Sequence, residues 1–224
     1  MIKLLCNQCY RNGDRMKLQD SRLFKDTNIN TSLIKTHEFP NNYTIELEGD
    51  VSTYIGIVLE GQIDVKAYSL AGKSFTISTL TPGMIFGDVL MFGKMSNVYP
   101  GNLVTKGSTT IAHIPNNDVK HYLNSDNVFM QNFLSVLSDK VYNINTKSKL
   151  LSQDSIRDKI LYYLHQEIRI QGSNRIQLNM SKEDLANILF IQRPSLSREL
   201  IKMRNEGLIE FDRWTITLKV KKGD

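Results

Sequence analysis

Residues 193–200, RPSLSREL, gather arginine and serine side chains at one point of the chain, directly after the helical stretch SKEDLANIL. Pro194 fits a helix only in its first turn, where the missing N–H has no intrahelical partner to lose. The helix is therefore predicted to begin near Arg193 and to end at Gly207, a typical helix terminator. Its outer face would carry Ser195, Arg198 and Lys202, with Ser197 in the first turns.

Those side chains match the chemistry of a DNA groove. An arginine guanidinium can bond both major-groove acceptors of guanine, and serine hydroxyls can reach bases or phosphates. Lysines at the rim neutralise phosphates without reading sequence. An ordinary solvated helix face is the other interpretation of exposed arginines. The neighbouring elements distinguish a DNA-binding face from such a solvated face. The DNA-binding residues that we predict are Lys182, Arg193, Ser195, Ser197, Arg198 and Lys202.

The neighbouring elements form a winged helix-turn-helix pattern. Ser181 and Asp184 make a capping-box-like start for a short helix, and the second helix follows almost at once. The two helices have inward faces made of Leu185, Ile188 and Leu189 and of Leu196, Leu200 and Met203. Residues 208–220 then give a β-hairpin with one apolar face, made of Trp214, Ile216, Leu218 and Val220. This succession of elements favours DNA binding over a solvated face.

Residues 33–114 read as short β runs separated by glycines. The segment YTIELEG alternates, and the branched and aromatic residues after it are interrupted at what we predict to be turns or tight corners, at Gly56, Gly61, Gly72, Gly83 and Gly87. Strands of this length and spacing are typical of a β-sandwich or roll.

After Asn117 the apolar period becomes that of a helix. A heptad seam runs along it and has one polar member: Met130, Leu134, Leu137, Val141, Ile144, Ser148 and Leu151. A second apolar edge is made of Phe129, Phe133 and Val136. One stripe would suit packing within the chain, whereas two stripes favour a helix that also packs on a second copy. We expect a homodimer, with core packing alone as the other interpretation.

Together these patterns predict an α+β chain in three parts. A double-stranded β-roll of the jelly-roll or cupin-like kind would span residues 1–125, a dimerisation helix 126–152, and a winged helix-turn-helix domain 153–224. The length of 224 residues suits one or two domains. A net charge of +5 is compatible with nucleic acid without requiring it.

The composition also bears on location and on metals. No apolar run approaches the ~18 residues of a membrane span, and no secretion signal is recognisable, so we expect a cytoplasmic protein without a membrane partner. Cys6 and Cys9 form a CxxC motif, but a structural zinc or an iron–sulfur cluster normally takes four protein ligands. The four histidines show no ligand-like spacing. We therefore expect no metal and no resident cofactor.

With these parts in order, the chain resembles the Crp/Fnr family of bacterial transcription regulators over nearly its whole length. YTIELEGDVSTYIGIVLEGQIDV is similar to the first roll strands of that family, and GMIFGDVLMF to the start of its effector-binding cassette. RPSLSRELIKMRNEGLI is similar to its recognition helix. The resemblance implies homodimers on a two-fold symmetric DNA site, a β-roll that senses a signal, and RNA polymerase as a further partner.

The cassette departs from the pattern of the cyclic-nucleotide-binding members. Asp88 stands where the resemblance implies a glutamate for the ribose, and Tyr99-Pro100 replaces the Arg-Ser pair for the phosphate. A cyclic phosphate would then lack a charge-assisted bidentate contact, so we do not expect cAMP. A small organic effector is one hypothesis, and a pocket filled by its own side chains is the other. The pocket, between the roll and the long helix, is predicted to be lined by Asp88, Val89, Leu90, Met91, Tyr99 and Asn145.

Two other functions compete with that of a DNA-binding regulator. A cupin-type enzyme would need closely spaced metal-binding histidines on the roll strands, yet His37 precedes the roll and His113 ends it. We interpret His113, which is also the candidate haem ligand on a late strand, as a packed strand residue. A ligand-sensing module that acts through protein partners would not need an exposed basic helix face. The sequence therefore favours a regulator that is not an enzyme.

Overall fold

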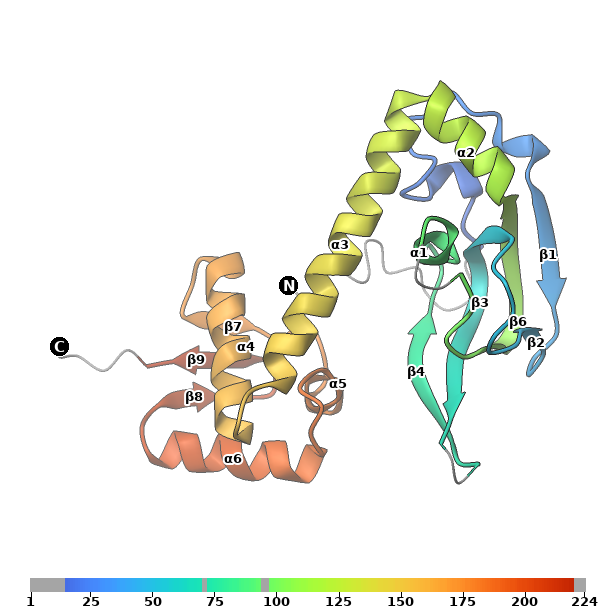
Figure 1. Ribbon diagram of the computed structural model, residues 1–224. Helices are drawn as coiled ribbons and strands as arrows, with labels where there is room; N and C mark the ends of the chain where they lie inside the picture. Colours follow the sequence, from blue (N-terminus) through green and yellow to red (C-terminus); the bar gives the residue numbers. More distant parts are fainter. Residues whose placement is uncertain (1–14, 70–71, 94–96, 220–224) are drawn as a thin grey trace. The chain divides into compact units, whose positions relative to one another are not determined.

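The computed structural model describes residues 15–69, 72–93 and 97–219. The chain divides into two compact units, and the boundary lies between Asp139 and Lys140, inside helix α3 (Asn127–Leu151). We call them the roll unit, which ends at Asp139, and the winged-helix unit, which begins at Lys140 (Figure 1). Helices and antiparallel sheets occur in both, which confirms the predicted α+β class.

The roll unit is built on a six-stranded antiparallel sheet. Its central strands β3 (Tyr54–Tyr68) and β6 (Asn102–Pro115) pair along most of their length. The other four strands flank this pair: β1 (Lys35–Phe39) and β2 (Thr44–Glu46) beside β6, and β4 (Ser74–Leu80) and β5 (Ile85–Phe86) beside β3. The helical elements of the unit are the 3-10 turns η2 (Leu18–Asp20) and η3 (Thr31–Leu33) and the helices α1 (Asp88–Met91) and α2 (Asn116–Ser125), followed by α3.

Strand β3 shows how the sequence divides the core of this unit. Side chains of a strand alternate between the two faces. Ile55, Ile57 and Leu59 enter one buried cluster, and Tyr54 and Val58 enter another with Phe86 and Leu103. Each face of the sheet therefore has its own apolar core.

Gly56 lies inside β3, so the prediction that it marks a turn or corner is wrong. The ring of Phe86, on β5, packs directly over the Gly56 backbone, and a Cβ on Gly56 would come within 2.0 Å of the Phe86 Cζ. A glycine in a strand can thus serve close approach rather than a turn.

Helix α3 has two apolar edges, as the sequence predicts. Phe129, Phe133 and Val136 are buried in the roll core, and the Phe129 ring centroid lies 5.3 Å from that of Phe24. An ion pair of 2.6 Å between Arg22 and Asp139 further ties the helix to its unit. Most of the heptad seam is exposed instead, although Leu137 packs against the roll core. Its most exposed apolar members are Leu134, Val141, Ile144 and Leu151, each about half or more accessible.

The winged-helix unit packs three helices against a small antiparallel sheet of order β7-β9-β8 (Figure 1). Its elements after α3 are α4 (Ile156–Gln171), β7 (Arg175–Gln177), α5 (Lys182–Ile188), α6 (Arg193–Asn205), β8 (Ile209–Phe211) and β9 (Thr215–Leu218). One buried cluster unites them, with Leu164, Leu185, Leu196, Leu200, Met203 and Ile216 among its members. The predicted order of helix, turn, helix and hairpin is confirmed.

Local signals in the sequence define the ends of these helices. Ser155 caps α4, and its hydroxyl accepts a bond of 3.0 Å from the Asp158 N–H. The predicted capping box is present at α5, where Ser181 and Asp184 bond each other's backbone N–H. Gly207, with φ of 74°, follows the end of α6 as predicted.

The wing differs from the prediction at Trp214. Asp212 accepts bonds of 2.7 Å from the N–H groups of Trp214 and Thr215, so the turn extends through Trp214 and β9 starts one residue later. The indole is 46% exposed and lies against the Arg213 guanidinium, whereas Ile216 is fully buried. The prediction that Trp214 shares the inward face with Ile216 is wrong, and Val220 lies outside the described residues.

Candidate nucleic-acid interface

Helix α6 begins at Arg193, with Pro194 in its first turn, as the proline predicts. Leu196, Leu200 and Met203 are fully buried beneath it. Because these residues recur every three or four positions, they fix which side of the helix faces outward. The orientation of the outer face therefore follows from core packing.

That outer face carries most of the predicted DNA-binding side chains. Arg193, Arg198 and Lys202 are exposed, while Ser195 and Ser197 are half-buried. An Arg198 guanidinium nitrogen donates to the Ser195 hydroxyl over 3.3 Å, so these two side chains lie together on adjacent turns. The face offers a guanidinium fork, a hydroxyl and an ammonium on one side of a single helix.

The turn between α5 and α6 is tight and left-handed. Phe190 has φ of 54°, a conformation that bulky residues adopt rarely, and the Ile191 N–H bonds the Ala186 carbonyl over 3.0 Å. The Lys147 ammonium, on the second half of α3, lies 4.8 Å from the centroid of the Phe190 ring. The turn is thus held by contacts to both α5 and α3.

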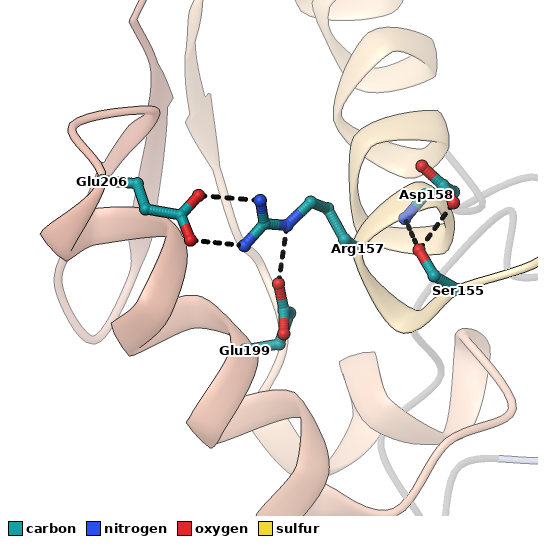
Figure 2. Close-up of polar contacts among 5 residues, drawn as sticks. All are labelled: Ser155, Arg157, Asp158, Glu199 and Glu206. Atoms are coloured by element: carbon teal, nitrogen blue, oxygen red, sulfur yellow. Dashed lines mark hydrogen bonds and ion pairs between the residues drawn. The ribbon is translucent and has the colours of Figure 1, made fainter.

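Arg157, on the first turn of α4, binds the carboxylates of Glu199 and Glu206 on the flank of α6. Its Nε donates to Glu199 over 2.7 Å, and its two terminal nitrogens donate to Glu206 over 2.7 and 2.9 Å (Figure 2). The bonds from Arg157 hold the pKa of Glu206 below its ordinary value, and the same bonds raise the pKa of Arg157. Both acids are therefore engaged inside the unit, and the bonds to Arg157 favour the ionised form of Glu206.

Lys182, the predicted phosphate contact at the start of α5, is half-buried. Its ammonium lies 4.2 Å from the centroid of the Phe211 ring, and the Arg204 guanidinium lies 5.1 Å from the same ring. Burial lowers the pKa of Lys182, and the nearby Arg204 lowers it further, against the opposing effect of Asp212. Lys182 is thus a desolvated cation packed against the base of the wing.

Sequence reasoning missed Arg157 and Arg204. Arg157 meets its partners 42 and 49 residues further along the chain, so no local pattern links them. Arg204 could have been found from its place in the last turn of α6, where a basic side chain is favoured by the helix dipole.

In the roll unit, four of the predicted effector residues, Asp88 to Met91, form α1 directly after β5, and Tyr99 lies shortly before β6. Gly87 has φ of 80°, and a Cβ there would lie 2.4 Å from the Tyr54 carbonyl oxygen, so the chain reverses closely before Asp88. Asp88 and Tyr99 are buried, at 2% and 3% exposure. Leu90 and Met91 are half-buried and pack toward the two roll cores, while Val89 is exposed.

Tyr99 fills the interior of this cassette with a neutral phenol. Its hydroxyl lies 3.5 Å from the Ser52 hydroxyl, and its backbone bonds Gly49 and Asp50 over 3.0 Å. Burial raises the pKa of Tyr99 to about 12, so the phenol stays protonated. Asn145 is exposed on α3 and belongs to the winged-helix unit.

Two carboxylates act on that phenol through their charge. Neighbouring Tyr54 donates to Glu46 over 2.7 Å, and burial raises the pKa of the Glu46 carboxyl. Glu46 and Asp50 both raise the pKa of Tyr99 through their charge, which places them near it.

No metal centre is found in the described part of the chain. Within residues 15–69, 72–93 and 97–219, no three His, Cys, Asp or Glu side chains gather closely enough to hold an ion. His113 packs its ring edge-on to that of Tyr54, with centroids 3.9 Å apart. Cys6 and Cys9 lie outside the described residues. In the same ranges, no helix is long and apolar enough to cross a membrane.

Two family descriptions match separate parts of the chain. Residues 36–126 match the cyclic nucleotide-binding domain, and residues 158–222 match the Crp-like helix-turn-helix domain. Together the two matches cover more than half of the chain and correspond to the roll and to the winged helix.

Individual proteins are similar to the chain over most of its length. The cyclic AMP receptor protein of Thermus thermophilus is 20% identical, and the match covers 87% of this chain and 88% of that protein. A CooA variant from Carboxydothermus hydrogenoformans shares the fold with a TM-score of 0.57 at 18% identity, over 94% of both chains. CprK in complex with OCPA gives a TM-score of 0.60 at 12% identity, over 84% of this chain and 88% of the other.

These matches agree with the architecture derived from the residues. A β-roll, a long helix and a winged helix occur in the order that the resemblance implies, and the relatives are regulators rather than enzymes. The chain belongs to the Crp/Fnr family of transcription regulators and combines a cyclic nucleotide-binding domain fold with a DNA-binding helix-turn-helix.

Proposed function

We propose that this regulator reads a two-fold symmetric DNA sequence as a homodimer, with one α6 helix in each half-site. The observation that supports this most strongly is the charge on α6. Arg193, Arg198 and Lys202 are exposed on its outer face, while Glu199 and Glu206 are engaged by Arg157. The face that meets solvent is therefore positive, and DNA is the polyanion that a helix-turn-helix accommodates.

The residues of α6 take different roles in this proposal. Arg198 lies on the outward face, one turn after Pro194, and its fork suits the two acceptors of guanine. Ser195 orients that fork and can itself reach a base, while Lys202 contacts a phosphate at the rim. Arg193 and Ser197 contact the DNA phosphate backbone beside the start of α6. Lys182, on its Phe211 ring, brings a further cation to the phosphates.

Dimerisation is proposed through the seam of α3. Leu134, Val141, Ile144 and Leu151 are exposed at heptad spacing, on a helix whose other apolar edge is already buried in the roll core. A second copy of the same helix would bury such a stripe by knobs-into-holes packing. Two copies would then present two α6 helices to the two halves of a symmetric site.

For the effector, we propose a ligand other than a cyclic nucleotide, or none. The Thermus relative is named for cyclic AMP, and CprK is solved with OCPA, so one fold serves different ligands. In this chain the buried Tyr99 phenol stands in place of the phosphate-binding pair, and within the described part of the chain the charges that act on it are those of Glu46 and Asp50. An anionic phosphate placed beside these carboxylates would lose its hydration and meet charges of its own sign.

Two measurements test this proposal. The affinity of the chain for mixed genomic DNA fragments should fall steeply as salt rises, because phosphate contacts release counterions. A sensing module that acts only through protein partners would show no such binding. In calorimetry, cAMP and cGMP should give no heat of binding at micromolar to millimolar concentration, and micromolar binding of either would contradict the interpretation of Tyr99.

A further inference from the structure

Arg157 links α4 to α6 through two acids on the flank of α6, next to the face that we propose to meet DNA. Glu199 and Glu206 are seven residues apart, so they lie on the same flank of the helix, about two turns from one another. Arg157 reaches both at once from the first turn of α4, with its side chain extended between them (Figure 2). No other residue type has a planar fork that can serve two carboxylates in this way.

Lys202 lies between those two acids along the helix. It follows Glu199 by three residues and precedes Glu206 by four, which are the spacings at which helix side chains pair. The Lys202 charge already lowers the pKa of Glu206, so the two groups are near each other. Among the residues that the structure describes, however, Lys202 makes no ion pair, because the carboxylates point to Arg157.

We propose that Arg157 is a positioning residue for DNA binding: it holds Glu199 and Glu206 away from Lys202 and so keeps that ammonium available for a DNA phosphate. The inference rests on the proposed role of α6. Without Arg157, the two carboxylates would pair with Lys202 within their own helix, and the phosphate would have to displace them. Arg157 itself sits on the flank and would touch no DNA.

A simpler role for the same bonds is to tie α4 to α6. That role predicts a loss of stability and a displaced helix, whatever residue stands at position 202. The positioning role predicts an effect that passes through Lys202 and disappears when Lys202 is absent. A double-mutant cycle separates these two roles.

The experiment uses the full chain and measures affinity for a selected DNA site from low to high salt. Arg157→Gln and Lys202→Ala should each reduce the slope of log affinity against log salt by about 0.9 for each half-site, hence about 1.8 for the dimer, or about twelvefold in affinity over a fourfold salt range. The double variant should show the slope of Lys202→Ala alone. Arg169→Gln, which removes an exposed arginine from the last turn of the same helix α4, is the matched control and should keep the wild-type slope.

A second arm guards against a folding defect. Arg157→Gln combined with Glu199→Gln and Glu206→Gln removes the clamp and both competing charges, and it should recover the wild-type slope. Thermal unfolding is measured in parallel, and Arg157→Lys replaces Arg157→Gln if the latter does not fold. Additive slope losses in the cycle, or a triple variant no better than Arg157→Gln, would overturn the inference while leaving DNA binding by α6 intact. A wild type whose DNA binding ignores salt would overturn both.

Discussion

The two units of this chain differ in where their predicted functional side chains lie, because several of these are buried in the roll unit and exposed in the winged-helix unit. In the roll unit, Asp88 and Tyr99 of the cassette are buried, and burial keeps the Tyr99 phenol neutral beside Tyr54 and Glu46. In the winged-helix unit, Arg193 and Arg198 are displayed on α6, and the acids beside them are engaged internally. One chain can thus display cations on a helix of one unit while, among the described residues of its other unit, carboxylates are the charges that act on the buried Tyr99 phenol.

The largest effect is expected from substitutions in α3, the helix that belongs to both units. Val141→Glu with Ile144→Glu puts two charges into the exposed seam and should give monomers in sedimentation. A monomer loses the avidity of two linked half-sites, so affinity for a two-fold site should drop by roughly 10²–10⁴. Gln131→Glu with Ser138→Glu, at exposed positions off the seam of the same helix, should remain dimeric. A dimeric seam variant would show that the seam serves core packing.

The next largest effect is a difference in stability between substitutions at the buried Tyr99 and at the exposed Arg198. Tyr99→Ala should destabilise the roll by about 3 kcal/mol, because a large buried ring leaves a cavity. Tyr99→Phe should cost about 1 kcal/mol, since it keeps the buried ring and removes only the hydroxyl with its contacts to Ser52 and Tyr54. Arg198→Ala, at an exposed site, should change stability by no more than about 0.5 kcal/mol. Urea unfolding of the three variants measures this order, and a mild Tyr99→Ala would mean that the cassette is not packed around the phenol.

The smallest effect is one of pH on the roll. Burial, with the charges of His37 and Lys35, lowers the pKa of His113, so the folded state favours the neutral imidazole. A lowered pKa means that stability is complete above the ordinary histidine pKa of about 6.5 and declines as pH falls through the lower folded value. The temperature of the thermal unfolding midpoint should therefore decrease as the pH is lowered from 8 to 5. The decrease should be smaller in His113→Phe. If the unfolding midpoint decreases equally with falling pH in both proteins, a group other than His113 is responsible.

Much of the winged-helix unit could be predicted because its signals are local. Pro194 marks the start of α6, Gly207 follows its end, and Ser181 with Asp184 caps α5, all within a few residues of the feature that each one specifies. The burial of Leu196, Leu200 and Met203 follows from helical period alone. The order of the elements therefore made DNA binding predictable from sequence.

What could not be predicted depends on contacts between distant residues. Gly56 resembles a turn residue until Phe86 is seen to pack on its backbone, and Trp214 looks like a strand residue until Asp212 takes both N–H groups of the turn. Arg157 gave no signal, because its partners lie more than 40 residues away. The chemistry around Tyr99 likewise depends on how β2 and the start of β3 approach the cassette.

Selection of binding sites from random DNA by the wild type, Arg198→Ala and Lys202→Ala tests the role of α6 most directly. A bidentate arginine–guanine contact is worth roughly 1–3 kcal/mol of discrimination. Arg198→Ala should therefore lose sequence preference at one symmetric pair of positions in the selected site. Lys202→Ala should recover the wild-type site with weaker, less salt-dependent binding. An Arg198→Ala protein that selects the unchanged wild-type sequence would show that α6 is not the element that reads DNA.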